Sequence, residues 1–179
     1  MIENMMPIDK LKKFISEFEF NENDDIENLI DLGFEYIEQN DFLNAFKVFK
    51  FGIKIDETNP DMLYGLGMSL CELGRYKASR IVFEKSVEIY PEDAIALANL
   101  AGAYWEEGEY NKAIHFYYRS LEIDSNIIET HLNLINLYYE KDDLYMAYIT
   151  SLNLLELFPT NKQAKELRDD IIMSMAISI

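Results

Sequence analysis

Apolar and polar positions along this chain recur with a period of 34 residues. Within each period the apolar residues are spaced three or four apart, which is the spacing of one face of an α-helix. A large apolar residue returns at Leu32, Leu66, Leu100 and Leu134, and a small residue returns at Ala45, Ser79, Ala113 and Ala147. Self-similarity at this period predicts an array of stacked helical hairpins.

Four units follow one another without insertion, over residues 26–59, 60–93, 94–127 and 128–161. Each is predicted to hold two helices joined by a tight turn. The turns carry residue types that tolerate a left-handed backbone, Asn40, Gly74, Gly108 and Asp142. The first helix has a small residue at Gly33, Gly67 and Ala101, and the second has an aromatic residue at Phe49, Phe83 and Tyr117. The fourth unit departs from both rules, at Ile135 and Ser151.

Two further segments lie outside the four units. Within residues 1–25, a helix over 7–20 with one apolar face is predicted to cover the first unit, although a dimerisation or docking arm is the alternative. Residues 162–179 do not continue the residue pattern, and their apolar stripe predicts a C-terminal capping helix. The final IIMSMAISI has more apolar residues than one stripe needs. It favours a self-association or partner surface, a frayed tail, or a contact with the last unit.

These positions resemble the tetratricopeptide repeat. That family's order of Leu-Gly, Tyr, Gly-x-Tyr, Ala, an aromatic residue and Pro is met best by residues 60–93 and 94–127. The resemblance implies an all-α fold, a right-handed α-solenoid (superhelix) of four helix-turn-helix units with N- and C-terminal capping helices.

Composition narrows the classes of partner. With 16 Lys and Arg against 33 Asp and Glu, the formal net charge is −17, which argues against nucleic acid and anionic membrane surfaces. A single cysteine, Cys71, favours a reducing compartment. The first residues show no secretory signal, and no apolar run is long enough to insert in a membrane. A cytoplasmic protein with neutral or basic partners is therefore expected.

No residue pattern indicates catalysis. His115 is predicted to face outward, and His131 occupies a position where the other units have Leu, so packing explains it. Cys71 has no basic neighbour in sequence to activate its thiol. No phosphate-binding loop, metal-ligand spacing or nucleophile motif is present. We expect no catalytic residue, no metal and no cofactor.

The resemblance implies a ligand-binding groove along the first helices of the units. It assigns to this groove Phe34, Ile37, Glu38, Tyr64, Met68, Cys71, Glu72, Asn99, Trp105, Glu106, Asn133, Asn136, Tyr139 and Glu140. The absence of Lys and Arg from the groove positions disfavours the co-chaperones of this family, which hold acidic tails. Glu38, Glu72, Glu106 and Glu140 recur every 34 residues and are predicted to form an acidic ladder. Alternatively, these glutamates are solvated helix formers and Trp105 packs between units.

These observations predict a non-enzymatic interaction module or scaffold that binds a peptide segment of a partner protein. The segment would carry apolar anchors and Lys or Arg. One alternative is a chaperone for an apolar client, similar to type III secretion chaperones, although those are typically built on three repeats. Another is a homo-oligomeric assembly unit that associates through its terminal helices.

Overall fold

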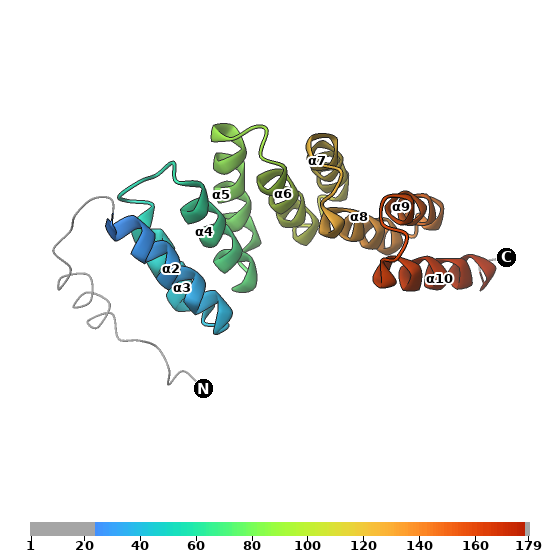
Figure 1. The fold of residues 1–179 in the computed structure, drawn as a ribbon, viewed down its shortest axis with the longest axis horizontal. Coiled ribbons are helices and arrows are strands. Elements are labelled where there is room, and N and C mark those ends of the chain that lie inside the picture. The colour runs from blue at the N-terminus through green and yellow to red at the C-terminus, as the bar shows by residue number, and fades with distance from the viewer. Residues whose placement is uncertain (1–23, 178–179) are drawn as a thin grey trace. The chain divides into compact units, whose positions relative to one another are not determined.

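The computed structural model describes residues 24–177, and every regular element within that range is an α-helix (Figure 1). The helices are α2 (Asp24–Glu38), α3 (Phe42–Gly52), α4 (Pro60–Glu72), α5 (Tyr76–Ile89), α6 (Ala94–Glu106), α7 (Tyr110–Ile123), α8 (Ile128–Glu140), α9 (Leu144–Leu157) and α10 (Lys162–Ile177). The predicted helix over residues 7–20 lies outside the described residues. From α5 onward, each helix begins 34 residues after its counterpart in the preceding pair.

The helices belong to two compact units, α2–α5 within residues 1–89 and α6–α10 within residues 90–179. In the first unit α2 packs against α3, α4 packs against α5, and both α2 and α3 contact α4. In the second unit α6 packs against α7, α8 packs against α9, and α10 contacts α9 and α8. These stacked helical hairpins form the all-α solenoid that the 34-residue period predicts.

The turns inside the four hairpins have the predicted left-handed residue. The φ angle is 57° at Asn40, 69° at Gly74, 77° at Gly108 and 60° at Asp142. In each turn the next residue donates its backbone N–H to the carbonyl five residues earlier, over 2.8–2.9 Å. This bond closes the preceding helix as a Schellman motif, which requires a positive φ at the residue before the donor.

Small residues in the first helices make room for aromatic rings. The Phe49 side chain is fully buried, and a Cβ added at Gly33 of α2 or Gly65 of α4 would lie less than 3.0 Å from its ring. A Cβ at Gly67 would meet the Phe83 ring in the same way. The aromatic position of each of these second helices therefore packs where a neighbouring helix has no side chain.

The fourth hairpin has the residue sizes at these two positions reversed. Ile135 and Ser151 replace the small residue and the aromatic residue, and both are 0% exposed. The Ser151 Oγ is satisfied by donating to the Tyr148 carbonyl over 2.6 Å. The larger side chain thus comes from the first helix of this hairpin rather than from the second.

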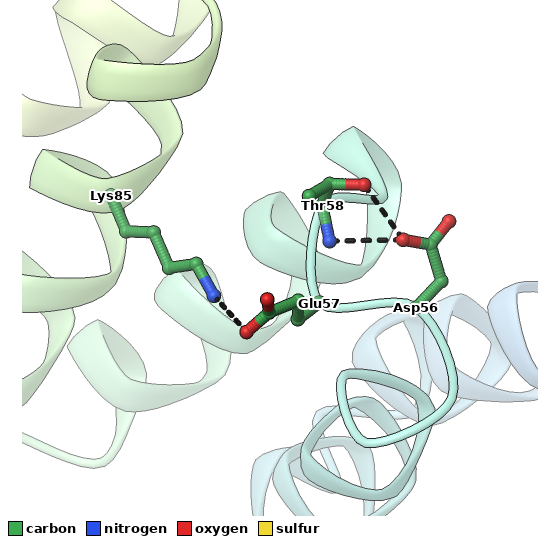
Figure 2. Close-up of polar contacts among 4 residues, drawn as sticks. All are labelled: Asp56, Glu57, Thr58 and Lys85. Atoms are coloured by element: carbon green, nitrogen blue, oxygen red, sulfur yellow. Dashed lines mark hydrogen bonds and ion pairs between the residues drawn. The ribbon is translucent and has the colours of Figure 1, made fainter.

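The connection between α3 and α4 is held by short-range polar contacts (Figure 2). The Asp56 Oδ1 atom accepts hydrogen bonds from the backbone N–H of Thr58 (2.9 Å) and from its hydroxyl (2.8 Å). These two bonds hold the pKa of the Asp56 carboxyl below its usual value. Glu57 forms an ion pair with Lys85 of α5, with 3.0 Å between the Oε2 and Nζ atoms. Asn59 then caps the first turn of α4 by accepting from the Met62 N–H.

The last helix, α10, begins 34 residues after α8 begins and so continues the helix spacing of the array. Its predicted inner stripe is confirmed at Ala164 and Ile171, which are 0% exposed, while Leu167 and Met175 are half-buried. Within the described residues no second helix pairs with α10 as α9 pairs with α8. On α10 the Ile172, Met173 and Ile177 side chains are exposed.

Candidate protein-binding surface

The four glutamates of the predicted ladder share one position in the fold. Glu38, Glu72, Glu106 and Glu140 are the last residues of α2, α4, α6 and α8, and all four side chains are exposed. None of these helices has a basic residue in its last turn. A helix C-terminus carries partial negative charge and favours cations, so a carboxylate there opposes the helix dipole. Helix stability alone does not account for these four residues.

The predicted apolar residues of the first unit lie together on α2 and α4. The Phe34 ring packs edge-on against Phe49, with 5.2 Å between centroids, and its centroid is 6.1 Å from that of Tyr64. The predicted Ile37 and Met68 side chains are half-buried. These side chains are thus supported by the core and retain exposed area, as a pre-formed apolar contact surface requires.

Cys71 has a local role within its own hairpin. Its Sγ atom lies 2.9 Å from the Ser79 Oγ, and Ser79 donates its hydroxyl proton to the Gly67 carbonyl over 2.9 Å. Because a hydroxyl has one proton, the Cys71 thiol is the donor to Ser79. The thiol therefore points to α5 of its own hairpin, and the half-buried residue links α4 to α5.

In the second unit, Trp105 and Glu140 are joined directly. The indole Nε1 donates to the Glu140 Oε2 over 2.7 Å, and the Tyr110 hydroxyl donates to the Oε1 over 2.8 Å. The bond to the Glu140 carboxylate raises the pKa of Tyr110. Trp105 is half-buried, so its ring keeps exposed area while its N–H is occupied. Trp105, a predicted anchor, is thus bonded to Glu140, a predicted member of the acidic ladder. Tyr110 binds the same carboxylate, and sequence reasoning did not assign it to the groove.

Tyr139 repeats this arrangement one hairpin later. Its hydroxyl lies 2.8 Å from the Ser174 Oγ of α10, and the two residues are separated by 35 positions, as are Trp105 and Glu140. The Tyr139 side chain is 43% exposed. Sequence reasoning missed Ser174, although the recurrence of a polar residue 35 positions after each aromatic was a signal that could have found it.

The predicted asparagines differ in their surroundings. Asn133 and Asn136 of α8 are half-buried. The Asn99 Nδ2 atom is buried and has no hydrogen-bond partner among the described residues. The Asn99 residue as a whole is half-buried, but its Nδ2 atom is covered by protein.

The other polar residues that sequence analysis considered lie apart from this surface. His115 is exposed, as predicted. His131 is 6% exposed, as its predicted packing role requires, and its Nε2 lies 3.0 Å from the Ser125 carbonyl oxygen. Among residues 24–177, no group of three or more His, Cys, Asp or Glu side chains is placed to hold a metal ion. No helix in that range is both long enough and apolar enough to cross a membrane.

A pocket that sequence reasoning did not predict lies between α8 and α10. It has a volume of about 360 Å³ and is lined by Ile135, Tyr139, Leu167, Asp170, Ile171, Met173, Ser174 and Ile177. Only Tyr139 belongs to the predicted groove. The pocket depends on how α10 packs on α8, and the residue pattern of α10 alone does not give that packing.

Comparison with known proteins identifies the repeat. A family model described as a tetratricopeptide repeat matches residues 60–126, which form the second and third hairpins. Residues 60–126 of this chain are tetratricopeptide repeats. The resemblance stated from the recurring residues is thus confirmed, and proteins of this family act as scaffolds for protein–protein interaction.

Two curated tetratricopeptide-repeat proteins are similar to part of this chain. Protein CTR9 homolog of Arabidopsis thaliana is 28% identical over 111 residues, which are 60% of this chain and 10% of that protein. Anaphase-promoting complex subunit 3 of Schizosaccharomyces pombe is 25% identical over 92 residues, which are 51% of this chain and 14% of that protein. This chain therefore matches only a small part of these relatives, and the similarity concerns the repeats.

A solved structure matches more of this chain. The MamA 41-end structure from Desulfovibrio magneticus RS-1 aligns with a TM-score of 0.72 and 25% sequence identity, over 84% of this chain and 85% of that one. The fold of this protein is thus that of a solved tetratricopeptide-repeat structure of similar extent.

Proposed function

We propose that this protein is a non-enzymatic scaffold that binds an apolar and basic segment of a partner protein along its first helices. The observation that carries the proposal is the position of the four ladder glutamates at helix C-termini without a basic residue in any last turn. A partner's Lys or Arg beside each carboxylate would offset both the carboxylate and the negative end of the helix.

Four aromatic residues with exposed area support the same proposal. Phe34 and Tyr64 in the first unit, and Trp105 and Tyr139 in the second, are held by ring contacts or hydrogen bonds. Because these side chains are already ordered, binding costs less conformational entropy on the protein's side. We place this activity in the reducing, cytoplasmic compartment that the single cysteine favours.

The test is an affinity capture from lysate with a triple variant as the second bait, Trp105→Ala with Glu72→Lys and Glu106→Lys. The matched control is Glu88→Lys with Glu122→Lys. These two glutamates occupy equivalent positions on α5 and α7, are exposed, and undergo the same change of charge. Circular dichroism first confirms that all baits are equally helical.

We expect partners with apolar and basic segments to be captured by the wild type and the control and lost from the triple variant. Equal capture by all three baits would contradict the proposal. A secreted, apolar client would assign the protein to the chaperone alternative. Recovery of the bait alone, with a mass that rises with concentration in light scattering, would favour the homo-oligomeric alternative.

A further inference from the structure

The pocket between α8 and α10 has features of a site for one large side chain. Its volume of about 360 Å³ is at the lower end of the range for ligand sites in proteins, about 300–1,000 Å³. Ile135 and Ile171 form a buried floor, whereas Met173 and Ile177 of α10 are 59% and 85% exposed. Apolar side chains that line an open pocket and remain exposed gain free energy when another apolar group covers them.

The pocket wall is held in place before any partner arrives. The Tyr139 hydroxyl is hydrogen-bonded to Ser174, which joins the end of α8 to α10 across the pocket, and Ser174 also donates to the Asp170 carbonyl oxygen. The wall is therefore fixed by contacts within the second unit. A ligand would not need to open this site, which lowers the cost of binding.

One uncompensated carboxylate lies in the pocket lining. On α10, Lys162 pairs with Glu166, with 3.3 Å between the Nζ and Oε1 atoms, and Arg168 pairs with Asp169, with 2.7 Å between the Nη2 and Oδ1 atoms. Within the described residues no Lys or Arg pairs with Asp170, which is the only charged residue lining the pocket. The last turn of α10 also lacks a basic residue.

This charge distribution indicates which kind of molecule would bind in the pocket. A second copy of the chain would bring another net charge of −17 to an acidic pocket, which opposes association. A segment with a large apolar side chain and a nearby Lys or Arg complements both the apolar lining and the Asp170 carboxylate. An acidic or purely apolar segment would leave Asp170 without a counter-charge.

We propose that the pocket between α8 and α10 is a terminal anchor site, which takes one large apolar side chain of a partner protein segment and pairs a Lys or Arg of that segment with Asp170. The kind of partner follows from the proposed function, but the location does not, because of the pocket residues only Tyr139 belongs to the predicted groove.

The probe is a random-peptide phage library panned against the full chain. Two variants alter the pocket, Met173→Gln and Asp170→Asn. Each has a matched neighbour on α10 that does not line the pocket, Ile172→Gln and Asp169→Asn. All four residues are exposed, so the variants are expected to fold. Affinities of the selected peptides are then measured for every variant.

Selected peptides should combine a large apolar residue with Lys or Arg. We expect Met173→Gln to weaken them about tenfold or more, because an apolar contact in a pocket is worth roughly 10–200-fold in discrimination. Asp170→Asn should weaken them about two- to fivefold at low salt, as expected for a partly exposed ion pair of less than about 1 kcal/mol. The two neighbouring variants should bind as the wild type does.

Four results would overturn the proposal. These are the absence of enriched peptides, peptides without basic residues, equal losses from pocket and neighbouring variants, and a concentration-dependent mass of the free protein that Met173→Gln abolishes. Peptides lost from Trp105→Ala with Glu106→Lys but retained by Met173→Gln would support the proposed function and exclude the pocket. Peptides that are lost from Met173→Gln but retained by Trp105→Ala with Glu106→Lys would support the pocket and contradict binding in the groove.

Discussion

At the scale of single residues, backbone conformation accounts for four turn positions. Gly74 and Gly108 have positive φ angles, and no atom lies within 4 Å of a Cβ added to either. The cost of a side chain there is therefore the strain of the left-handed backbone alone, about 1–2 kcal/mol for an L-residue. Asn40 and Asp142 accept the same conformation because their short polar side chains tolerate it.

Gly74→Ala and Gly108→Ala should each lower the free energy of unfolding by about 1 kcal/mol. Gly102→Ala is the control, because it should raise the free energy of unfolding. Gly102 lies inside α6, where an added Cβ would have only the Tyr117 hydroxyl at 3.6 Å, so Ala should stabilise the helix by about 0.5–1 kcal/mol. Urea unfolding followed by circular dichroism measures all three, and a shared sign would contradict the interpretation.

Asp56 provides a pH-dependent contribution to stability. Its folded-state pKa is lowered, mainly by the hydrogen bond from the Thr58 backbone N–H and then by that from the Thr58 hydroxyl. A lowered pKa stabilises the fold fully above the unfolded value of about 4, and this stabilisation is lost as the pH falls through the folded value. Asp56→Ala should therefore be less stable than the wild type at neutral pH.

The difference in unfolding free energy between Asp56→Ala and the wild type should shrink as the pH is lowered below about 4. Urea midpoints measured for both proteins at each pH check this expectation. Thr58→Ala, which removes the hydroxyl donor but keeps the backbone donor, should give a smaller difference in the same pH range. A difference that does not change with pH would show that packing, rather than ionised Asp56, is responsible.

At the scale of helices, we expect the glutamates of the acidic ladder to lower the stability of the helices that they end, while they give the protein a charged surface. Glu72→Gln removes a carboxylate from the C-terminus of α4, so the variant should be more stable by about 0.3–1 kcal/mol. Glu140→Gln should behave differently, because its carboxylate accepts from both Trp105 and Tyr110. We expect a loss of about 1 kcal/mol there, since these bonds are charge-assisted but exposed.

Thermal unfolding of the two variants tests this contrast. Trp105 is the only tryptophan of the chain, so its fluorescence reports directly on the bond to Glu140. The emission spectrum should change in Glu140→Gln and stay the same in Glu72→Gln. Equal stabilities for both variants would mean that neither the helix dipole nor the Trp105 bond matters at these positions.

The packing of each hairpin is a property of two helices together. The first two hairpins place a small residue against an aromatic ring, as at Gly67 and Phe83, and the fourth has buried residues of reversed size at the same two positions, Ile135 and Ser151. Because interiors are close-packed, a change at one of the two positions is tolerated only with a matching change at the other.

Ser151→Phe alone should cost about 1–3 kcal/mol through overpacking, and Ile135→Gly alone about 2–5 kcal/mol through a cavity. The double variant should be more stable than the sum of the two predicts, by about 0.5–3 kcal/mol. The control cycle combines Ser151→Phe with Leu137→Ala, at a buried residue of the same helix, and should be additive. Additivity in both cycles would contradict the size exchange.

At the scale of the whole molecule, the net charge of −17 affects folding and binding in opposite directions. Like charges repel one another in the folded chain, and salt screens that repulsion over a Debye length of about 10 Å at 0.1 M. The unfolding temperature should therefore rise with added NaCl. The affinity for basic peptides should fall over the same range, because screening weakens their attraction to the acidic surface.

Differential scanning calorimetry and peptide titrations across one series of NaCl concentrations measure both trends. An uncharged osmolyte series serves as the control, since it does not screen charge. Affinity that does not depend on salt would mean that apolar contacts alone govern binding.

Much of the architecture follows from the sequence because the forces that set it are local. Repeated apolar spacing predicts the helices, and Asn40, Gly74, Gly108 and Asp142 predict the turns, since few residue types adopt a positive φ. Small residues such as Gly67 predict a close approach between helices. These inferences need only the residue type and its position in the period, so the chain alone determined the hairpins and their number in residues 26–161.

The tertiary structure decided which partner each side chain meets. Trp105 and Glu140 stand 35 residues apart, and their bond depends on the direction in which packed helices present two side chains. The contact between the Cys71 thiol and Ser79 also depends on how the helices pack. So does the pocket between α8 and α10, which Asp170 lines. Contacts between helices depend on how the helices pack in three dimensions, and a linear period carries no information about that.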